Sequence, residues 1–184
     1  GKCQTVAWYL LSLVDDVLDM SKLESGDVPL VEGAFRLDDL LDQCRDIIAP
    51  QAWERGLTFT VEDRLPPEDR ALVSSATHLR QILTNLLSNA VKYTSSGMVQ
   101  IYCEEPLTLC IKDTGIGIAP EDLPRIFEKG YTGCNGRLDK KASGIGLYLC
   151  KRICVRLGHK ISAESSDNGT VIRILLESRR LGIE

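Results

Sequence analysis

Two glycine-containing loops carry residue types that could bind a nucleotide. Asp113 ends a short apolar run, residues 107–111, and is followed by Gly115 and Gly117. Glycine permits positive φ and close approach of backbone or ligand, so this pattern indicates a strand that ends in a shaped loop. A second loop, residues 143–147, opens an apolar helical pattern. Either loop alone is more typical of a tight turn. Together they suggest a split site in which the aspartate reads a base and free N–H groups at a helix start receive phosphate.

A row of polar side chains precedes the first of these loops. Asn85 and Asn89 are four residues apart and Lys92 follows three later, so all three would share one face of a helix. Asparagine is unfavourable inside a helix because its amide competes for backbone hydrogen bonds. An Asn oxygen could bind Mg²⁺ while phosphates and water complete the octahedron, and a lysine could neutralise phosphate. A solvated helix face with satisfied amides fits the spacing equally well.

The surrounding pattern predicts an α+β domain that would position these residues. Helical periodicity covers residues 37–54, 75–93 and 145–157, with Ser74 or Ser75 as the cap of the second helix. Short β-rich runs cover residues 57–61, 71–73, 99–103, 107–113, 159–165 and 170–176. We therefore expect two layers, with three helices over one face of a mixed sheet that contains antiparallel hairpins.

Two further segments connect these elements. Pro120 opens a predicted short helix that reaches Phe127. Residues 128–143 are polar and contain glycine without an apolar period, which is typical of a mobile loop.

The N-terminal 26 residues form a separate pattern. Apolar residues recur at helical steps over residues 6–23, and Ser25-Gly26 with Pro29 marks the end of the helix. A single amphipathic helix ahead of a globular pattern must bury its apolar stripe against a partner helix or a second copy of itself. We interpret residues 1–26 as a truncated interaction segment and residues 27–184 as the main domain.

The composition excludes several classes of protein. The chain has 184 residues and a net charge of −4, which argues against a general nucleic-acid surface. No apolar run approaches membrane-spanning length, and the N-terminus lacks a signal-peptide layout, so we expect a cytoplasmic location. The seven cysteines include no Cys-x-x-Cys pair and are expected to be buried thiols. A disulfide between Cys103 and Cys110 across a hairpin is the less favoured alternative.

Four motifs together resemble those of sensor histidine kinases. Residues 85–93 (NLLSNAVKY) resemble the N box, residues 113–118 (DTGIGI) the G1 box, residues 126–129 (IFEK) the F box, and residues 143–149 (SGIGLYL) the G2 box. Their order and spacing also match, and the N-terminal helix is similar to the end of the second dimerisation helix of these kinases. The resemblance implies the Bergerat-type ATP fold, which is shared with chaperone, gyrase and mismatch-repair ATPases.

The resemblance implies a role for each motif residue. Asn89 would hold Mg²⁺ with Asn85 in support, Lys92 would contact phosphate, and Tyr93 would pack on the adenine side. Asp113 would accept the adenine amino hydrogen, which suits a side chain that only accepts. Phe127 would anchor the loop over the nucleotide, and Arg137 is a candidate γ-phosphate contact beside the lysines. The full ATP-binding set expected from the motifs is Asn85, Asn89, Lys92, Tyr93, Asp113, Gly115, Gly117, Ile118, Phe127, Lys129, Lys140, Lys141, Gly144, Ile145, Gly146 and Leu147; Asn85, Asn89 and Lys92 would also serve catalysis.

The sequence departs from the family pattern in two ways. Tyr148 stands where a third glycine is common, as in a subgroup of the family. More importantly, the phosphoacceptor motif is missing, because His78 and His159, the two histidines, lack its Glu and Pro neighbours. We therefore expect a fragment whose phosphoacceptor helix lies upstream.

The resemblance predicts that this domain delivers the ATP γ-phosphoryl group to a histidine of a dimerisation domain. The parent would be a homodimer that acts on a response regulator, with membrane attachment only through upstream segments and no nucleic-acid partner. A nucleotide-binding regulatory module without phosphotransfer is the alternative. A hydrolytic relative is disfavoured, because Asn85 stands where those ATPases carry a glutamate.

Overall fold

The computed structural model describes residues 2–26, 31–65, 71–131, 146–177 and 179–180. Its elements follow the order α1 (Lys2–Ser25), β1 (Gly33–Arg36), α2 (Leu37–Glu54), β2 (Thr58–Asp63), β3 (Ala71–Ser74), α3 (Ala76–Lys92), β4 (Met98–Glu104), β5 (Thr108–Asp113), η2 (Leu123–Arg125), α5 (Gly146–Leu157), β6 (Lys160–Ser166), β7 (Gly169–Leu175) and β8 (Arg179–Arg180).

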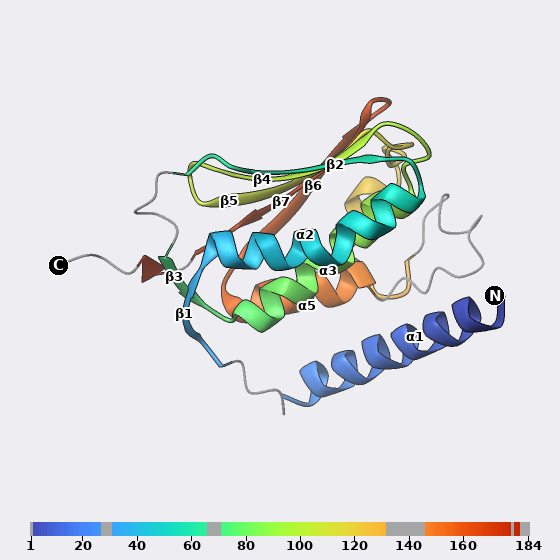
Figure 1. The fold of residues 1–184 in the computed structure, drawn as a ribbon. Helices are drawn as coiled ribbons and strands as arrows, with labels where there is room; N and C mark the ends of the chain where they lie inside the picture. The colour runs from blue at the N-terminus through green and yellow to red at the C-terminus, as the bar shows by residue number, and fades with distance from the viewer. Residues whose placement is uncertain (1, 27–30, 66–70, 132–145, 178, 181–184) are drawn as a thin grey trace.

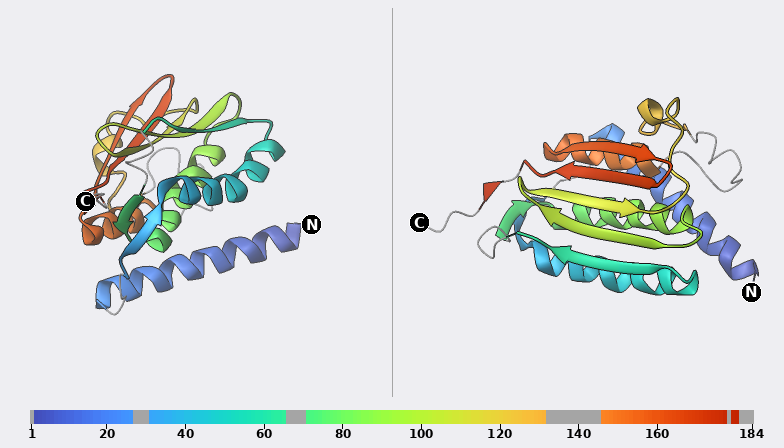
Figure 2. Two further views of the ribbon diagram at one scale, coloured as in Figure 1. Left: turned by 60° about the vertical axis from the view of Figure 1, so that its left-hand side comes forward. Right: turned by 90° about the horizontal axis from the view of Figure 1, so that it is seen from above.

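A five-stranded mixed sheet forms one layer. Its strand order is β2-β4-β5-β7-β6, with β2 and β4 parallel and the other neighbours antiparallel. Helices α2, α3 and α5 cover one face of this sheet, as the side and top views show (Figures 1 and 2). The expected two-layer α+β architecture is therefore confirmed.

The core fills the space between these helices and the sheet. Helix α3 buries the seven apolar residues that its sequence period places on one face: Leu79, Ile82, Leu83, Leu86, Leu87, Ala90 and Val91. They meet buried residues of β4 and β5, including Ile101, Leu109 and Ile111. Ser75, one of the two predicted cap residues, caps α3. Its Oγ accepts the His78 N–H at 3.4 Å. The asparagine-bearing helix is thus fixed against the sheet along its whole length.

A second, small sheet was not predicted. Strand β3 pairs with β1 and β8, both antiparallel, and Phe35 of β1 lies opposite Leu72. The sequence predicts the helix at residues 37–54 but no strand before it, because a four-residue strand shows too little alternation to be recognised. Pairing with a distant strand, not local pattern, makes β1 extended.

The predicted short helix from Pro120 to Phe127 was wrong in extent. Only Leu123–Arg125 forms a single 3₁₀ turn, and turns flank it on both sides. Pro124 has no N–H to donate to the carbonyl of Pro120, so an α-helix across this segment would lack one of its hydrogen bonds.

Helix α1 lies on the side of the helical layer that faces away from the sheet (Figures 1 and 2). It contacts α5, and Met20 packs against the core. Leu10, Leu11, Val14, Val17 and Leu18 remain 42–64 % exposed, so the apolar stripe finds no cover among the described residues. No helix in the described part of the chain is sufficiently long and apolar to span a membrane.

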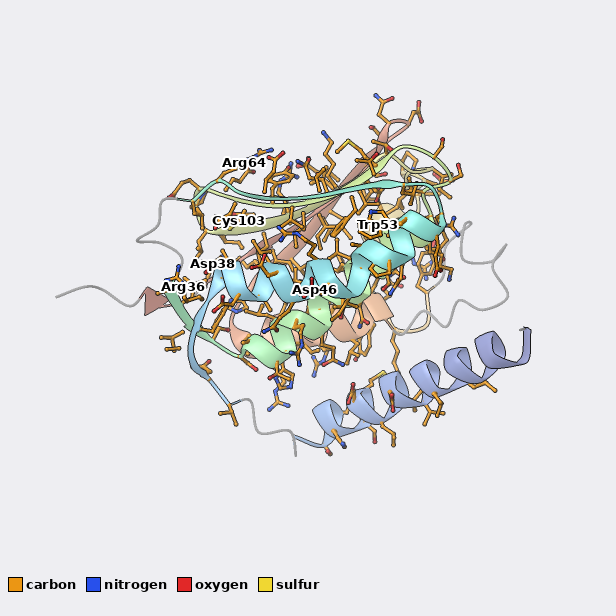
Figure 3. The ribbon with its side chains drawn as sticks, in the orientation of Figure 1. Arg36, Asp38, Asp46, Trp53, Arg64 and Cys103 are labelled. Atoms are coloured by element: carbon orange, nitrogen blue, oxygen red, sulfur yellow. The ribbon has the colours of Figure 1, made fainter. Side chains whose placement is uncertain are left out.

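Five cysteines whose side chains the structure describes are free and buried: Cys44, Cys103, Cys110, Cys150 and Cys154. Cys103 lies opposite Leu109 and Cys110 opposite Tyr102 across β4 and β5, so the two thiols project from opposite faces of the sheet. Figure 3 shows Cys103 on the helix side and Arg64 on the other side. Burial raises the pKa of the Cys103 thiol to about 12. The prediction of buried thiols is confirmed for these five.

Candidate nucleotide site

Asp113 ends β5 with one carboxylate oxygen engaged and the other available. Its Oδ1 accepts the Gly115 N–H at 2.9 Å and the Thr170 N–H at 3.3 Å. No described residue donates a hydrogen bond to Oδ2. The two backbone contacts fix the orientation of the carboxylate, and its second oxygen can accept a hydrogen bond from a ligand.

The environment of Asp113 opposes its charge. Burial raises the pKa of this half-buried carboxyl, and the bonds from Gly115 and Thr170 partly offset that effect. A partly desolvated acceptor that its own neighbours do not saturate is typical of a binding position more than of a structural ion pair.

The loop after Asp113 is attached to the C-terminal end of α3. The Ile116 N–H donates to the Tyr93 carbonyl at 3.3 Å. A Cβ on Gly115 would lie 2.5 Å from the Tyr93 carbonyl oxygen and 2.8 Å from Thr94 Oγ1, so the close packing requires glycine. Thr94 is buried and its Oγ1 donates to the Ala90 carbonyl at 2.7 Å. These contacts join the glycine loop to the helix that carries the asparagines.

The other side of the loop rests on the β6–β7 hairpin. The Ile118 N–H donates to Ser165 Oγ at 2.7 Å. Gly117 has φ +74°, and a Cβ there would lie 2.4 Å from the Ser166 carbonyl oxygen. Gly117 therefore shapes the loop as predicted, because both its conformation and its contact exclude a side chain.

Gly169 is a close neighbour of Asp113 that sequence reasoning missed. Its φ is +122°, and a Cβ would lie 1.9 Å from the Asp113 carbonyl oxygen. The local pattern of residues 167–169 indicates only a turn. Their approach to Asp113 follows from the register of β5 with β7, in which Asp113 pairs with Thr170, and no local pattern reveals that register.

The asparagine row has the helical placement that its spacing predicts. Asn85 and Asn89 are half-buried on α3, and the Lys92 ammonium lies 5.1 Å from the centre of the Tyr93 ring. The Asn85 amide nitrogen is buried, and no described residue accepts a hydrogen bond from it. A buried amide without a partner is costly, so this row has hydrogen-bonding capacity that a ligand could use.

The donor set suits magnesium bound together with phosphate. The described residues contain no group of three His, Cys, Asp or Glu side chains that could hold a metal ion by themselves. Two amide oxygens from Asn85 and Asn89 are hard ligands, and Mg²⁺ ordinarily takes its remaining ligands from phosphates and water. The residues present therefore fit a nucleotide-bound magnesium ion.

Arg55 forms hydrogen bonds at the C-terminal end of α3, next to Lys92. Its guanidinium donates to the Lys92 carbonyl at 3.1 Å and to the Thr94 carbonyl at 3.4 Å. The Lys92 carbonyl has no intrahelical partner at the end of α3, and a cation there is favoured by the helix dipole. The motifs did not indicate Arg55, because it lies far away in sequence after α2.

Two predicted residues follow η2. Phe127 is half-buried and packs against the core, which agrees with an anchoring role. The Lys129 ammonium lies 3.1 Å from Glu24 Oε1 of α1, so in this structure its partner is a carboxylate of the chain itself.

The remaining predicted residues lie at or before the start of α5. Gly146 is the first residue of the helix, and a Cβ there would meet no described atom within 4 Å. Leu147 packs against the core. Arg137, Lys140, Lys141, Gly144 and Ile145, with most of the expected mobile loop, lie outside the described residues.

The two histidines are structural in this fold. His78 Nδ1 lies 2.7 Å from Ser75 Oγ in the first turn of α3. His159 is buried, with Nε2 3.0 Å from Ser74 Oγ and Nδ1 accepting the Glu177 N–H at 3.2 Å. Burial lowers the pKa of both imidazoles.

An aspartate-bearing glycine loop attached to an asparagine-bearing helix under a mixed sheet defines a nucleotide-binding α+β domain. A family model described as "Histidine kinase-, DNA gyrase B-, and HSP90-like ATPase" matches residues 74–180. The chain belongs to this family, and it is an ATP-binding catalytic domain of the kind found in sensor histidine kinases.

Among curated relatives, the sensor protein GacS of Pseudomonas syringae pv. syringae is 34 % identical over 177 residues, which cover 90 % of this chain and 19 % of that protein. The histidine-protein kinase BarA of Escherichia coli strain K12 is 31 % identical over 169 residues, covering 86 % and 18 %. The chain thus spans about a fifth of the length of these two relatives.

Solved structures confirm the fold. Full-length ShkA in complex with AMPPNP superposes with a TM-score of 0.80 at 27 % identity, covering 94 % of this chain and 36 % of that one. The histidine kinase ThkA in complex with the response regulator protein TrrA gives a TM-score of 0.72 at 23 % identity, covering 93 % and 48 %.

Proposed function

We propose that this domain binds Mg·ATP between the α3 row and the Asp113 loop and delivers the γ-phosphoryl group to a histidine of a dimerisation domain. The observation that carries the proposal is the junction at Tyr93. There the Ile116 N–H bonds to the helix end and Gly115 packs against it, so the loop of the proposed base-reading carboxylate is joined to the helix of the proposed phosphate-binding row.

Asp113 would select adenine. Oδ1 is held by two backbone N–H groups, and Oδ2 would accept the exocyclic amino hydrogen of the base. A carboxylate cannot donate to this position when ionised, so it favours a donor on the base. Tyr93, Gly115, Gly117 and Ile118 would line the base.

The phosphates would lie along the row on α3. Lys92 would neutralise a phosphate, and the unpaired Asn85 amide would donate to a phosphate oxygen or present its own oxygen. Asn89, with Asn85 in support, would hold Mg²⁺, which when bound neutralises phosphate charge. Gly146, together with Gly144, would offer backbone N–H groups at the start of α5.

The acceptor histidine would come from another domain. His78 and His159 are fixed by serine contacts, one on α3 and the other buried next to β6. The exposed apolar stripe of α1 supports our interpretation of residues 1–26 as part of a dimerisation helix and residues 27–184 as the catalytic domain. Phosphoryl transfer depends mainly on positioning and charge neutralisation, and that domain would position the acceptor.

The partners would follow from this role. The parent protein would be a homodimer through its dimerisation helices, and the phosphorylated histidine would serve a response regulator. The crystallised ThkA complex is a precedent for that partner within the same fold.

The test is phosphoryl transfer from γ-labelled ATP. We expect the chain alone to acquire no acid-labile label, because neither of its histidines can reach an in-line position. A histidine-bearing dimerisation domain added in trans should become labelled weakly, since no linker concentrates the two domains. Variants His78→Ala and His159→Ala serve as controls. Labelling of the isolated chain that either variant abolishes would contradict the proposal, and binding without any transfer would favour the regulatory module.

A further inference from the structure

Lys129 connects the segment after η2 with the N-terminal helix. Its ammonium pairs with Glu24 at 3.1 Å, although the motif resemblance implies a contact with phosphate. Both side chains are about half exposed, at 53 % and 42 %, so the pair is screened by solvent and can exchange partners. Lys129 comes two residues after Phe127, which is packed against the core.

Glu24 occupies a position that helix electrostatics disfavour. It lies in the last turn of α1, where the helix dipole favours cations over carboxylates. A carboxylate at such a position gains more from an external cation than one elsewhere on the helix would. Lys129 supplies that cation from the catalytic domain.

A second contact holds the same part of α1 beside the asparagine row. The Gln81 side-chain amide donates to Asp19 Oδ2 at 2.6 Å, and Met20 packs against the core. Gln81 precedes Asn85 by four residues on α3, so it extends the Asn85–Asn89 row at its N-terminal end. The final turns of α1 therefore contact both Gln81, one turn before Asn85, and Lys129, two residues after Phe127.

We propose that Glu24 and the terminal phosphate of a bound nucleoside triphosphate compete for Lys129, so that α1 is held more tightly before the triphosphate binds and is loosened by it. This inference rests on the proposed function and adds a regulatory contact to the same site. A multiply charged phosphate is a stronger partner for an ammonium than a half-exposed carboxylate. A diphosphate lacks the terminal group and leaves the Glu24 contact intact.

The test compares Mg·AMP-PNP and Mg·ADP binding in calorimetry. Glu24→Gln should tighten AMP-PNP about two- to fivefold, the range for an exposed ion pair, and leave ADP unchanged. Asp15→Asn is the matched control, because Asp15 is an exposed carboxylate of α1 with no ion-pair partner among the described residues. It should change neither affinity. In a Lys129→Gln background the Glu24→Gln effect should disappear.

Hydrogen exchange gives an independent readout. Coupling between two sites is reciprocal, so AMP-PNP binding should in turn loosen α1. We expect AMP-PNP to accelerate amide exchange in the last turns of α1 by about the same factor by which Glu24→Gln increases the affinity for AMP-PNP. ADP should not change this exchange. Unchanged AMP-PNP affinity in Glu24→Gln, with binding still dependent on Asp113, would overturn the competition and leave the nucleotide site standing. If neither nucleotide binds the wild-type chain, both proposals are wrong.

Discussion

Replacing Asp113 with alanine is expected to weaken ADP binding by roughly 10- to 150-fold while the fold persists. This range corresponds to about 1.5–3 kcal/mol for a hydrogen bond to a charged group. The substitution removes Oδ2, the proposed acceptor of the adenine amino hydrogen. It also removes Oδ1, which accepts the Gly115 and Thr170 N–H groups. Calorimetric titration of the purified domain measures the change directly.

Asp113→Asn is the matched control for this prediction. Its amide oxygen can still accept the Gly115 and Thr170 N–H groups, and it removes a charge whose burial raises the carboxyl pKa. We expect this variant to keep or slightly increase the free energy of unfolding, yet to lose ADP affinity, because an amide N–H would face the adenine N–H. Unaltered ADP affinity in both variants would exclude Asp113 from the site.

The largest effect on stability is expected from Gly169→Ala. The new Cβ would lie 1.9 Å from the Asp113 carbonyl oxygen, and the backbone φ of +122° disfavours any L side chain. Overpacking and backbone strain together should lower the free energy of unfolding by about 2–5 kcal/mol. Nucleotide affinity should fall as well, because the Thr170 N–H that orients Asp113 belongs to the next residue. Urea denaturation measures the loss.

Gly158→Ala separates the two contributions. Gly158 also has positive φ, at +77°, but a Cβ there would meet no described atom within 4 Å. Its substitution should cost only the backbone strain, about 1–2 kcal/mol, without an effect on nucleotide affinity. If the two alanine variants lose equal stability, the close approach of Gly169 to Asp113 is not a constraint on this fold.

Features set by local pattern were predicted well. The period of α3 identified all seven of its buried apolar residues, and the asparagine spacing placed Asn85 and Asn89 on one row, because helical geometry fixes both. Ser75 was recognised as a possible cap for the same local reason. Asp113 and its glycines were identified because a second glycine loop follows at residues 143–147; either loop alone is more typical of a tight turn.

Features set by long-range pairing were not predicted. Gly169 and Thr170 reach Asp113 through the register of β5 with β7, and Ser165 reaches Ile118 through the same hairpin. Arg55 meets the end of α3 across a separation of 37 residues. Strand β1 forms through its pairing with the sequence-distant β3. None of these contacts leaves a local sequence signal, because each depends on which strands and helices become neighbours.

The most direct test of the central claim is titration of ADP into the wild-type domain with Mg²⁺ and again with excess chelator. We expect one saturable site per chain, with tighter binding in Mg²⁺, and loss of that magnesium dependence in Asn89→Ala. The Asn89 variant should retain the chelator-level affinity, because Asp113 and the loop that holds it are intact. Binding that is absent, or that is equally tight with and without Mg²⁺, would contradict a nucleotide site built from the α3 row and the Asp113 loop.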